Sequence, residues 1–425
     1  MRSFGRNVAP LAAAWLAVTA LTTVPAAAQS VSVKGQVRPR AVVDSGRDFI
    51  KGGVAEREHI NQRSRLWADV SAGEGKPWLR VMLQDVRTWG EETSAVHDKS
   101  AQGLDIQEAF FVVPTELGLS LKIGRQELIY DNHRLIGNIG WLQRAQSFDG
   151  VRAIWKLGAV TLDSFAVMVR ERDDWDGDGT PSGATADTRL GGIQARWTNK
   201  KAGKPNEKPV ETAKASLSWF VRDDDVTGEL RSTIGTIAWA RLGGLTTTLE
   251  AYYQLGSLQG GETIGAYLGA IDVEYGIDAP LQPLVGVFAD VLSGDGAAGS
   301  AFDTLAATNH KFYGEMDFFL AIPKHTANLG LMDIGAKVVA RRLGPAKLFV
   351  TFHQLMAATA DARGESTFGQ EIDVKIAAKV AESIGVRALY GVFVPGEAMR
   401  TARGIATGIT LHTEHFAYLT LDAQF

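Results

Sequence analysis

Arginine side chains recur two residues apart in several stretches of the sequence. Arg38 and Arg40 form one such pair, and Arg63 and Arg65 form another. Residues two apart on a β-strand point to the same face of the sheet, so each pair would concentrate positive charge on one face. The planar guanidinium group binds a carboxylate through two parallel hydrogen bonds. The spacing therefore predicts a sheet face that attracts carboxylate groups.

The same face carries further charged residues along the rest of the chain. Basic residues outnumber acidic ones there, although the whole chain has a formal net charge of −4. A low-dielectric wall lined by one sign of charge focuses the field and selects ions of the opposite sign. The alternative is that these charges form ion pairs that only brace the fold, and the two roles are compatible. The residues predicted to face a solute are Arg38, Arg40, Arg63, Arg65, Arg80, Arg152, Arg170, Arg196, Arg222, Lys337, Lys375, Arg387, Glu371 and Asp373.

The elements that would hold these residues are strands with period-two hydropathy. In "EIDVKIAAKV", the apolar Ile372, Val374 and Ile376 alternate with Asp373 and Lys375. Segments of about ten residues that alternate in this way, separated by turn residues, are the signature of a transmembrane β-barrel. A soluble β-sandwich also alternates, and the two folds must be separated by other features. The same pattern recurs in the stretches 213–222, 245–255 and 331–341.

Composition and the two ends of the sequence favour the barrel. The chain has 46 glycines, 13 prolines and no cysteine. After the N-terminal segment, no stretch approaches the roughly 18 consecutive apolar residues that a transmembrane helix needs. Basic residues, an apolar run and Ala26–Ala28 predict a cleaved signal peptide over residues 1–28. We expect residues 29–425 to form one outer-membrane β-barrel, whose closing strand ends at Phe425.

The pattern contains 18 candidate strands. Sixteen is the alternative count, because the segments near Asp105 and Leu117 break the alternation. A barrel of this size encloses a lumen rather than a packed core. The longest connection, 293–329, would cover or enter that lumen. The other long connections are expected at roughly 44–58, 88–103, 130–147, 173–188 and 395–405.

The most distinctive part of the sequence is "LKIGRQELIYDNHRLIGNIGWLQRAQSFDGVRAIW", from Leu121 to Trp155. It combines Gly-Arg-Gln-Glu-Leu, Arg-Leu-Ile-Gly and Phe-Asp-Gly-Val-Arg. Two further stretches, "LQDVRTWG" and "FGQEIDVKIAAKV", belong to the same pattern, which resembles the alginate-export family of outer-membrane channels. The resemblance is carried within the longest stretch by Gly124, Arg125, Gln126, Glu127, Arg134, Asp149 and Gly150.

This resemblance implies an 18-stranded monomeric barrel for acidic polysaccharide or related solutes. One local feature departs from regular alternation, because Leu121 and Ile123 share a face with Arg125. A β-bulge near Gly124 would explain the departure.

The expected function is that of a passive outer-membrane channel for anionic, alginate-like saccharides. The runner-up is a general or anion-selective nutrient porin, and a third alternative is a structural or adhesive barrel plugged by 293–329. The expected partners are the anionic saccharide, outer-membrane lipid and the barrel-assembly machinery. Neither nucleic-acid binding nor catalysis is expected.

One weak metal signal lies in "DDWDGDGTPSG". Asp174, Asp176 and Asp178 have the spacing of a calcium loop. An EF-hand needs a bidentate Glu at the twelfth position, where Thr185 stands. A loosely bound Ca²⁺ and a solvated acidic loop are the two readings, and no other cofactor is expected.

Overall fold

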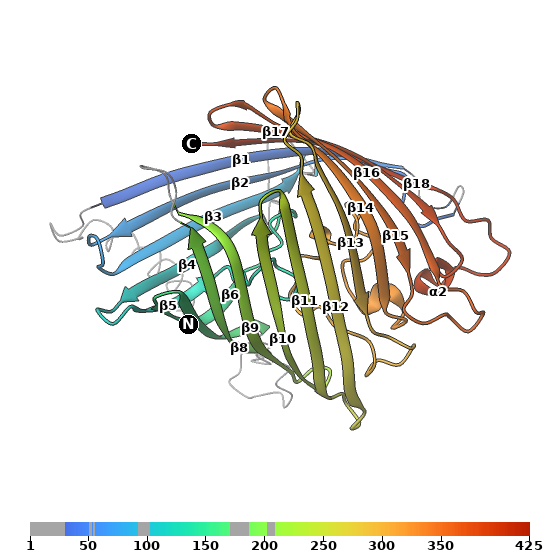
Figure 1. Cartoon of the computed structure of the whole chain (residues 1–425), viewed down its shortest axis with the longest axis horizontal. Coiled ribbons are helices and arrows are strands. Elements are labelled where there is room, and N and C mark those ends of the chain that lie inside the picture. The colour runs from blue at the N-terminus through green and yellow to red at the C-terminus, as the bar shows by residue number, and fades with distance from the viewer. Residues whose placement is uncertain (1–29, 51–52, 54–55, 92–102, 171–186, 202–208) are drawn as a thin grey trace, which may run out of the picture.

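The fold is a single antiparallel sheet that closes on itself (Figure 1). The computed structural model describes residues 30–50, 53, 56–91, 103–170, 187–201 and 209–425. Its strands are β1 (Ser30–Asp44), β2 (Arg57–Ser71), β3 (Trp78–Thr88), β4 (Leu104–Pro114), β5 (Leu119–Gln126), β6 (Phe148–Leu157), β7 (Val160–Arg170), β8 (Thr188–Lys201), β9 (Val210–Asp224), β10 (Glu229–Leu242), β11 (Leu245–Ser257), β12 (Thr263–Gly276), β13 (Leu284–Leu292), β14 (Leu331–Leu343), β15 (Ala346–Met356), β16 (Thr367–Ala381), β17 (Ile384–Pro395) and β18 (Glu414–Gln424).

Each strand pairs with the next one in sequence, and β1 pairs with β18 to complete the ring. The closing register runs from Gln36 opposite Gln424 to Asp44 opposite Phe416. Closure leaves no unpaired strand edge, which a membrane-spanning sheet requires. The predicted count of 18 strands is confirmed. The last strand was expected near Thr407 but begins at Glu414, because a loop precedes it.

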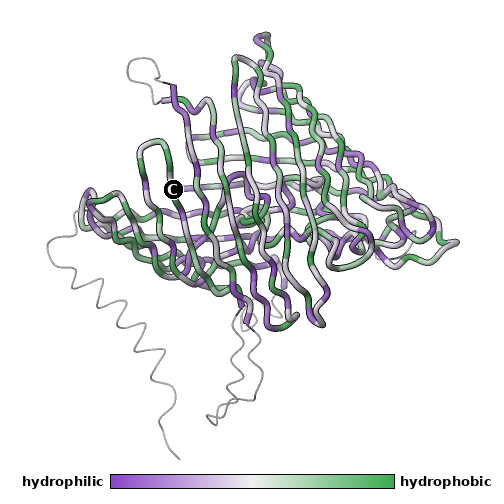
Figure 2. The backbone as a smooth tube through the Cα atoms, turned by 60° about the horizontal axis from the view of Figure 1, so that its bottom comes forward, coloured by the Kyte–Doolittle hydropathy of each residue, from purple (hydrophilic) through white to green (hydrophobic). Residues whose placement is uncertain are grey.

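Alternation along each strand separates two faces of the barrel. In β16, Ile372, Val374 and Ile376 are 47%, 40% and 40% exposed on the outer face, whereas Glu371 and Asp373 are buried on the inner face. Figure 2 shows the resulting alternation of hydrophobic and hydrophilic residues along the strands. An apolar outer band with a polar interior is the arrangement of a transmembrane barrel.

The described helices are short and belong to the connections. They are η1 (Asn309–Lys311), η2 (Lys324–Thr326) and α2 (Met399–Arg403). None of the described helices is long and apolar enough to cross a membrane.

Two long connections fold into the barrel. The inner loop 127–147 joins β5 to β6, and the inner loop 293–330 joins β13 to β14. The two loops touch through a parallel bridge between Ile136 and Ala306, and each supplies fully buried apolar side chains, such as Leu128 and Phe302. The prediction that 293–329 covers or enters the lumen is confirmed.

The prediction of a β-bulge near Gly124 is wrong. Residues Leu119 to Gln126 of β5 pair in continuous register with β6, and Gly124 lies opposite Phe110 of β4 without a register shift. Gly124 has φ +120° and a Cβ there would lie 2.3 Å from the carbonyl oxygen of Ala109. The close approach of β4 therefore requires glycine, and Arg125 lies on the outer face of an unbroken strand.

Candidate functional site: the charged lumen

Arg134 connects the inner loop 127–147 to strands β11 and β13 of the barrel wall. Arg134 donates from Nε to Glu250 on β11 at 2.9 Å and from Nη1 to Asp290 on β13 at 2.6 Å. Its guanidinium carbon lies 4.0 Å from the ring centre of Phe312 in the other inner loop. Burial opposes the charge on Arg134, but the two carboxylates outweigh it and raise the pKa of Arg134 well above its ordinary value. Arg134 is therefore a permanently charged anchor for both loops.

Buried carboxylates on β16 hold the inner loop 293–330. The backbone N–H of Met316 donates to Glu371 at 2.9 Å, and that of Glu315 donates to Asp373 at 3.2 Å. Glu371 is fully buried and Asp373 is 2% exposed. We therefore assign both carboxylates to holding the loop, and their predicted contact with a solute stays a prediction.

Strand β1, three strands from β16 around the ring, holds the inner loop 127–147 by its carbonyl groups. Arg38 donates to the carbonyl oxygens of Gly140, Trp141 and Leu142 at 2.9, 3.2 and 2.8 Å. Arg40 donates to Trp141 O at 2.8 Å and stacks on the Trp141 ring, 3.6 Å from its centre. Both arginines are more than nine-tenths buried.

The neighbouring strand β2 continues this row. Arg63 donates twice to the amide oxygen of Gln36, at 3.1 and 2.8 Å. Arg65 donates to the amide oxygen of Gln84 at 2.8 Å and has a carboxylate, Glu127, only at 3.8 Å. Among the described residues, Arg38, Arg40 and Arg63 form no ion pair with a carboxylate. Their hydrogen-bond acceptors are neutral, so no direct ion pair cancels their positive charge.

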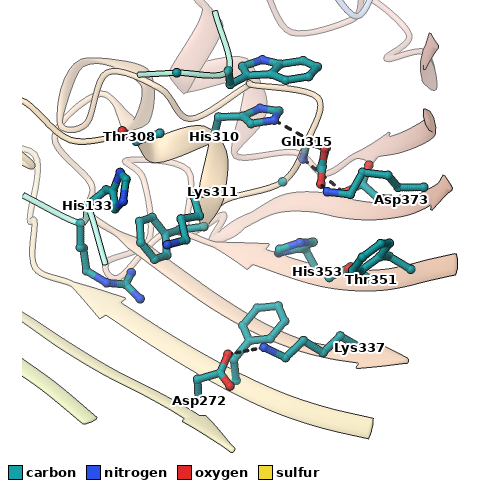
Figure 3. Close-up of a pocket in the computed structure, with 18 of the residues that line it drawn as sticks. His133, Asp272, Thr308, His310, Lys311, Glu315, Lys337, Thr351, His353 and Asp373 are labelled. Atoms are coloured by element: carbon teal, nitrogen blue, oxygen red, sulfur yellow. Dashed lines mark hydrogen bonds and ion pairs between the residues drawn. The ribbon is translucent and has the colours of Figure 1, made fainter. Parts of the chain in front are cut away.

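Other predicted lumen cations are paired with acids. Arg152 donates to both oxygens of Asp163, at 2.9 and 2.6 Å, and Lys337 lies 2.6 Å from Asp272 (Figure 3). These ion pairs agree with the alternative that some lumen charges serve to stabilise the barrel. The remaining pairs are Arg80 with Asp69 and Glu108, Arg222 with Asp303 and Glu229, Lys337 with Glu274, and Lys375 with Glu315.

Besides Arg38, Arg40 and Arg63, three further predicted cations have no ion pair within the described part of the chain: Arg170, Arg196 and Arg387. Arg170 is exposed and lines a cavity of about 420 Å³ beside Arg222. Arg196 is half-buried on β8. Arg387 is exposed and lines two cavities, a central one of about 710 Å³ and one of about 500 Å³ toward the short-turn end.

The motif residues divide between the two faces of the barrel. Gln126 is fully buried in the lumen and donates to the carbonyl oxygens of Gly124 and Gly150. Glu127 accepts from Asn138 within the inner loop 127–147 at 2.7 Å. Arg125 and Asp149 instead pair at 2.8 Å on the outer face.

Sequence reasoning missed the junction between the two inner loops. The ring of His310 stacks on Trp141 at 4.1 Å, and Asp317 accepts from both Trp141 Nε1 and His310. Trp141 is thus enclosed between His310 and Arg40. The Trp within the distinctive "GNIGWLQ" segment was the available signal, but nothing local to it indicates a partner more than 160 residues away.

The calcium prediction at Asp174, Asp176 and Asp178 falls outside the described residues. Within the described ranges, no group of three or more His, Cys, Asp or Glu residues is placed to hold a metal ion.

A closed barrel with an apolar outer band, short turns at one end and long connections at the other defines an outer-membrane channel. Residues 29–338 match the alginate export family. The chain therefore belongs to the alginate export family, as its motifs predicted, and is a bacterial outer-membrane β-barrel. No curated protein matches it.

Solved structures from Pseudomonas aeruginosa share the fold at low sequence identity. OpdK with vanillate has a TM-score of 0.57 and 14% identity, over 93% of this chain and 98% of that one. The outer membrane protein OpdK has a TM-score of 0.59 and 13% identity, over 94% and 99%. OccK8 (OprE) has a TM-score of 0.62 and 10% identity, over 94% and 98%.

Proposed function

We propose that this outer-membrane channel passes anionic saccharides of the uronate type by passive diffusion. The observation that carries the proposal is the row formed by Arg38, Arg40 and Arg63, whose hydrogen bonds go to neutral carbonyl, amide and hydroxyl oxygens rather than to carboxylates. Arg387 extends this positive surface into the two cavities. A polyuronate presents one carboxylate on every sugar, and membership of the alginate export family supports this class of solute.

The contacts of a moving solute must be weak as well as attractive, because conduction requires that each site release its ion. Arg38, Arg40 and Arg63 are almost wholly buried. They would therefore act mainly through the electrostatic potential, while the exposed Arg387 could contact the carboxylate directly. We propose a monomer embedded in outer-membrane lipid as the working unit, inserted by the barrel-assembly machinery.

A second candidate function is a porin for small carboxylates. The central cavity of about 710 Å³ falls in the range of roughly 300–1,000 Å³ typical of small-molecule sites, and the two inner loops narrow the lumen around it. One structure that shares the fold, OpdK, was solved with vanillate, a small aromatic carboxylate. These observations favour a short solute over a long polymer.

The reversal potential of the purified channel in a planar bilayer under a KCl gradient tests the proposal. Anion selectivity is expected, and cation selectivity would refute both candidates. Block of the current by oligouronates, with no block by neutral oligosaccharides of equal length, supports the saccharide channel. Block by monomeric carboxylates but not by oligouronates would favour the porin instead.

A matched pair of variants locates the selectivity. Arg387→Gln removes a positive charge from the lumen and should lower anion selectivity. Arg189→Gln removes one from the outer face, where Arg189 pairs with Asp187 and Asp223, and should leave selectivity unchanged. An equal response of the two variants would show that surface charge rather than the lumen controls the current.

A further inference from the structure

The two inner loops meet at a stacked pair of aromatic rings. His310 of the inner loop 293–330 lies flat on Trp141 of the inner loop 127–147, with ring centres 4.1 Å apart and planes inclined by 2°. The side chain of His310 is only 11% exposed, and both residues line the central cavity. Movement of one loop away from the other would therefore separate this stack and change the width of the lumen.

Both ring nitrogens of His310 face carboxylates. Nδ1 lies 2.6 Å from Asp317 Oδ1, and Nε2 lies 3.5 Å from Glu315 Oε2 (Figure 3). A neutral imidazole has one N–H, whereas the imidazolium has two, so only the protonated ring can donate toward both carboxylates. A cation over the face of an indole is also favourable. The arrangement is therefore complementary to a protonated His310.

Asp317 links the two loops through this contact. Its Oδ2 accepts from Trp141 Nε1 at 3.0 Å, while its Oδ1 faces His310. The Asp317 side chain is 10% exposed, and within the described ranges His310 is its one ion-pair partner. Loss of the proton from His310 would leave a largely buried carboxylate without a counter-charge, which is strongly unfavourable.

Positive charge on the other side of the indole opposes this arrangement. The guanidinium carbon of Arg40 on β1 lies 3.6 Å from the centre of the Trp141 ring. Trp141 thus has a cation on both faces when His310 is protonated and on one face when it is neutral. The two carboxylates beside His310 offset the repulsion from Arg40.

The second carboxylate beside the ring has other partners. Glu315 pairs with Lys375 of β16, and the hydroxyl of Tyr418 on β18 donates to its Oε2 at 3.5 Å. Its backbone N–H donates to Asp373 of β16. Glu315 therefore keeps a counter-charge when the ring loses its proton. Further charged or titratable side chains of the same cavity wall are Arg38, His133, Lys311, His353 and Arg387.

We propose that His310, Trp141 and Asp317 form a proton-dependent latch between the two inner loops. The latch is closed while His310 is protonated, and it loosens as the pH rises and the ring loses its proton. Histidine ordinarily changes charge within about pH 5–8, so the lumen changes width in this range. The inference goes beyond the proposed solute, because it concerns how wide the channel is rather than what passes through it.

Single-channel recordings of the purified protein in KCl, from about pH 5 to about pH 9, test the latch. Brief increases in current, produced as the loops part, should become roughly tenfold more frequent as the pH rises. This is the effect expected from the loss of one hydrogen bond between charged groups. A frequency that does not change with pH would overturn the proposal.

Two substitutions of the histidine fix the latch in opposite states. His310→Gln has no ring to protonate and should show the frequent increases in current at every pH. His310→Arg supplies a permanent planar cation and should show the infrequent increases at every pH. A response to pH that persists in His310→Gln would assign it to other groups, such as Glu371 or His353, and would overturn the latch.

A second histidine of the cavity provides the matched control. His133 is half-buried in the inner loop 127–147, and among the described residues it has no ion pair. His133→Gln should keep the wild-type response to pH. Loss of the response in this variant as well would show that it is not specific to His310 and would overturn the proposal.

Asp317→Asn tests the latch from the other side of the ion pair. The amide oxygen still accepts from Trp141, but the charge that favours the protonated His310 is gone. This variant should show the frequent increases in current already at about pH 5, where wild type shows few. Wild-type behaviour of Asp317→Asn would refute the latch even if His310→Gln failed to fold.

The outcomes separate the latch from the proposed function. Anion selectivity without a response to pH refutes the latch and keeps the channel function. A response to pH that requires His310, in a channel that selects cations, keeps the latch and refutes the proposed solute.

Discussion

Two parts of the barrel wall, β1 and β16, lie three strands apart and hold the inner loops with opposite chemistry. On β1, arginines donate to the carbonyl oxygens of the inner loop 127–147. On β16, carboxylates accept from backbone N–H groups of the inner loop 293–330. The two parts of the wall contribute charge of opposite sign, because each side chain keeps its own charge when its hydrogen-bond partner is neutral. The cation on β16, Lys375, pairs with Glu315 of the inner loop 293–330.

This difference changes how a charge count should be read. Counting the charged residues of the lumen gives Arg152 and Arg63 equal weight. Arg152, however, forms an ion pair with Asp163, whereas Arg63 donates a hydrogen bond to the neutral side-chain amide of Gln36. Only the second kind leaves an uncompensated positive charge to attract an anion. The lumen is therefore better described by which cations have neutral acceptors than by how many cations it contains.

Among the substitutions considered, the loss of Arg134 should have the largest effect on how the inner loops are held in the lumen. Arg134→Met leaves Glu250 and Asp290 buried without their partner, which costs on the order of 3–5 kcal/mol for buried pairs. We expect the inner loops to leave the lumen, single-channel conductance to rise and the unfolding midpoint in denaturant to fall. Arg144→Met, an exposed position in the same loop, is the control. Unchanged conductance and stability for Arg134→Met would show that Arg134 does not anchor the loops.

An intermediate effect is expected from the uncompensated arginines. Arg63→Gln should lower the anion-to-cation permeability ratio by up to roughly sixfold at low salt, because one charge about 8 Å from a passing ion contributes about 0.5 kcal/mol in water, with opposite signs for the anion and the cation. The double variant Arg152→Gln/Asp163→Asn removes a complete pair and should leave the ratio unchanged. Reversal potentials at low and high salt measure both effects, and high salt should reduce the first. Equal shifts of the reversal potential in the two variants would show that arginines with neutral acceptors and arginines in ion pairs contribute alike to selectivity.

The smallest effect is expected at Arg125, although it belongs to the most distinctive motif. Its pair with Asp149 is 34% and 59% exposed on the outer face, and exposed pairs contribute about 0–1 kcal/mol. Arg125→Gln should leave selectivity and conductance unchanged and change stability by at most this amount. A clear loss of anion selectivity in the same bilayer measurement would place Arg125 in the lumen after all.

The barrel, its strand count and its lipid-facing surface could be predicted from the sequence because alternation is a local property. A period of two decides the face of each residue within its own strand, as in Ile372 and Asp373. The pattern failed at two places: at Gly124, which looked like a bulge and is a tight contact with β4, and before the last strand, which begins at Glu414 rather than near Thr407.

The partner of each lumen charge was decided by the tertiary structure. Arg134 and Asp290 are 156 residues apart in the chain, and Trp141 and Asp317 are 176 apart. No local periodicity encodes such contacts, because they arise only when the closed ring brings opposite walls and two inward loops together. The sequence alone determined that the lumen would be charged, and the fold decided which of those charges remain uncompensated.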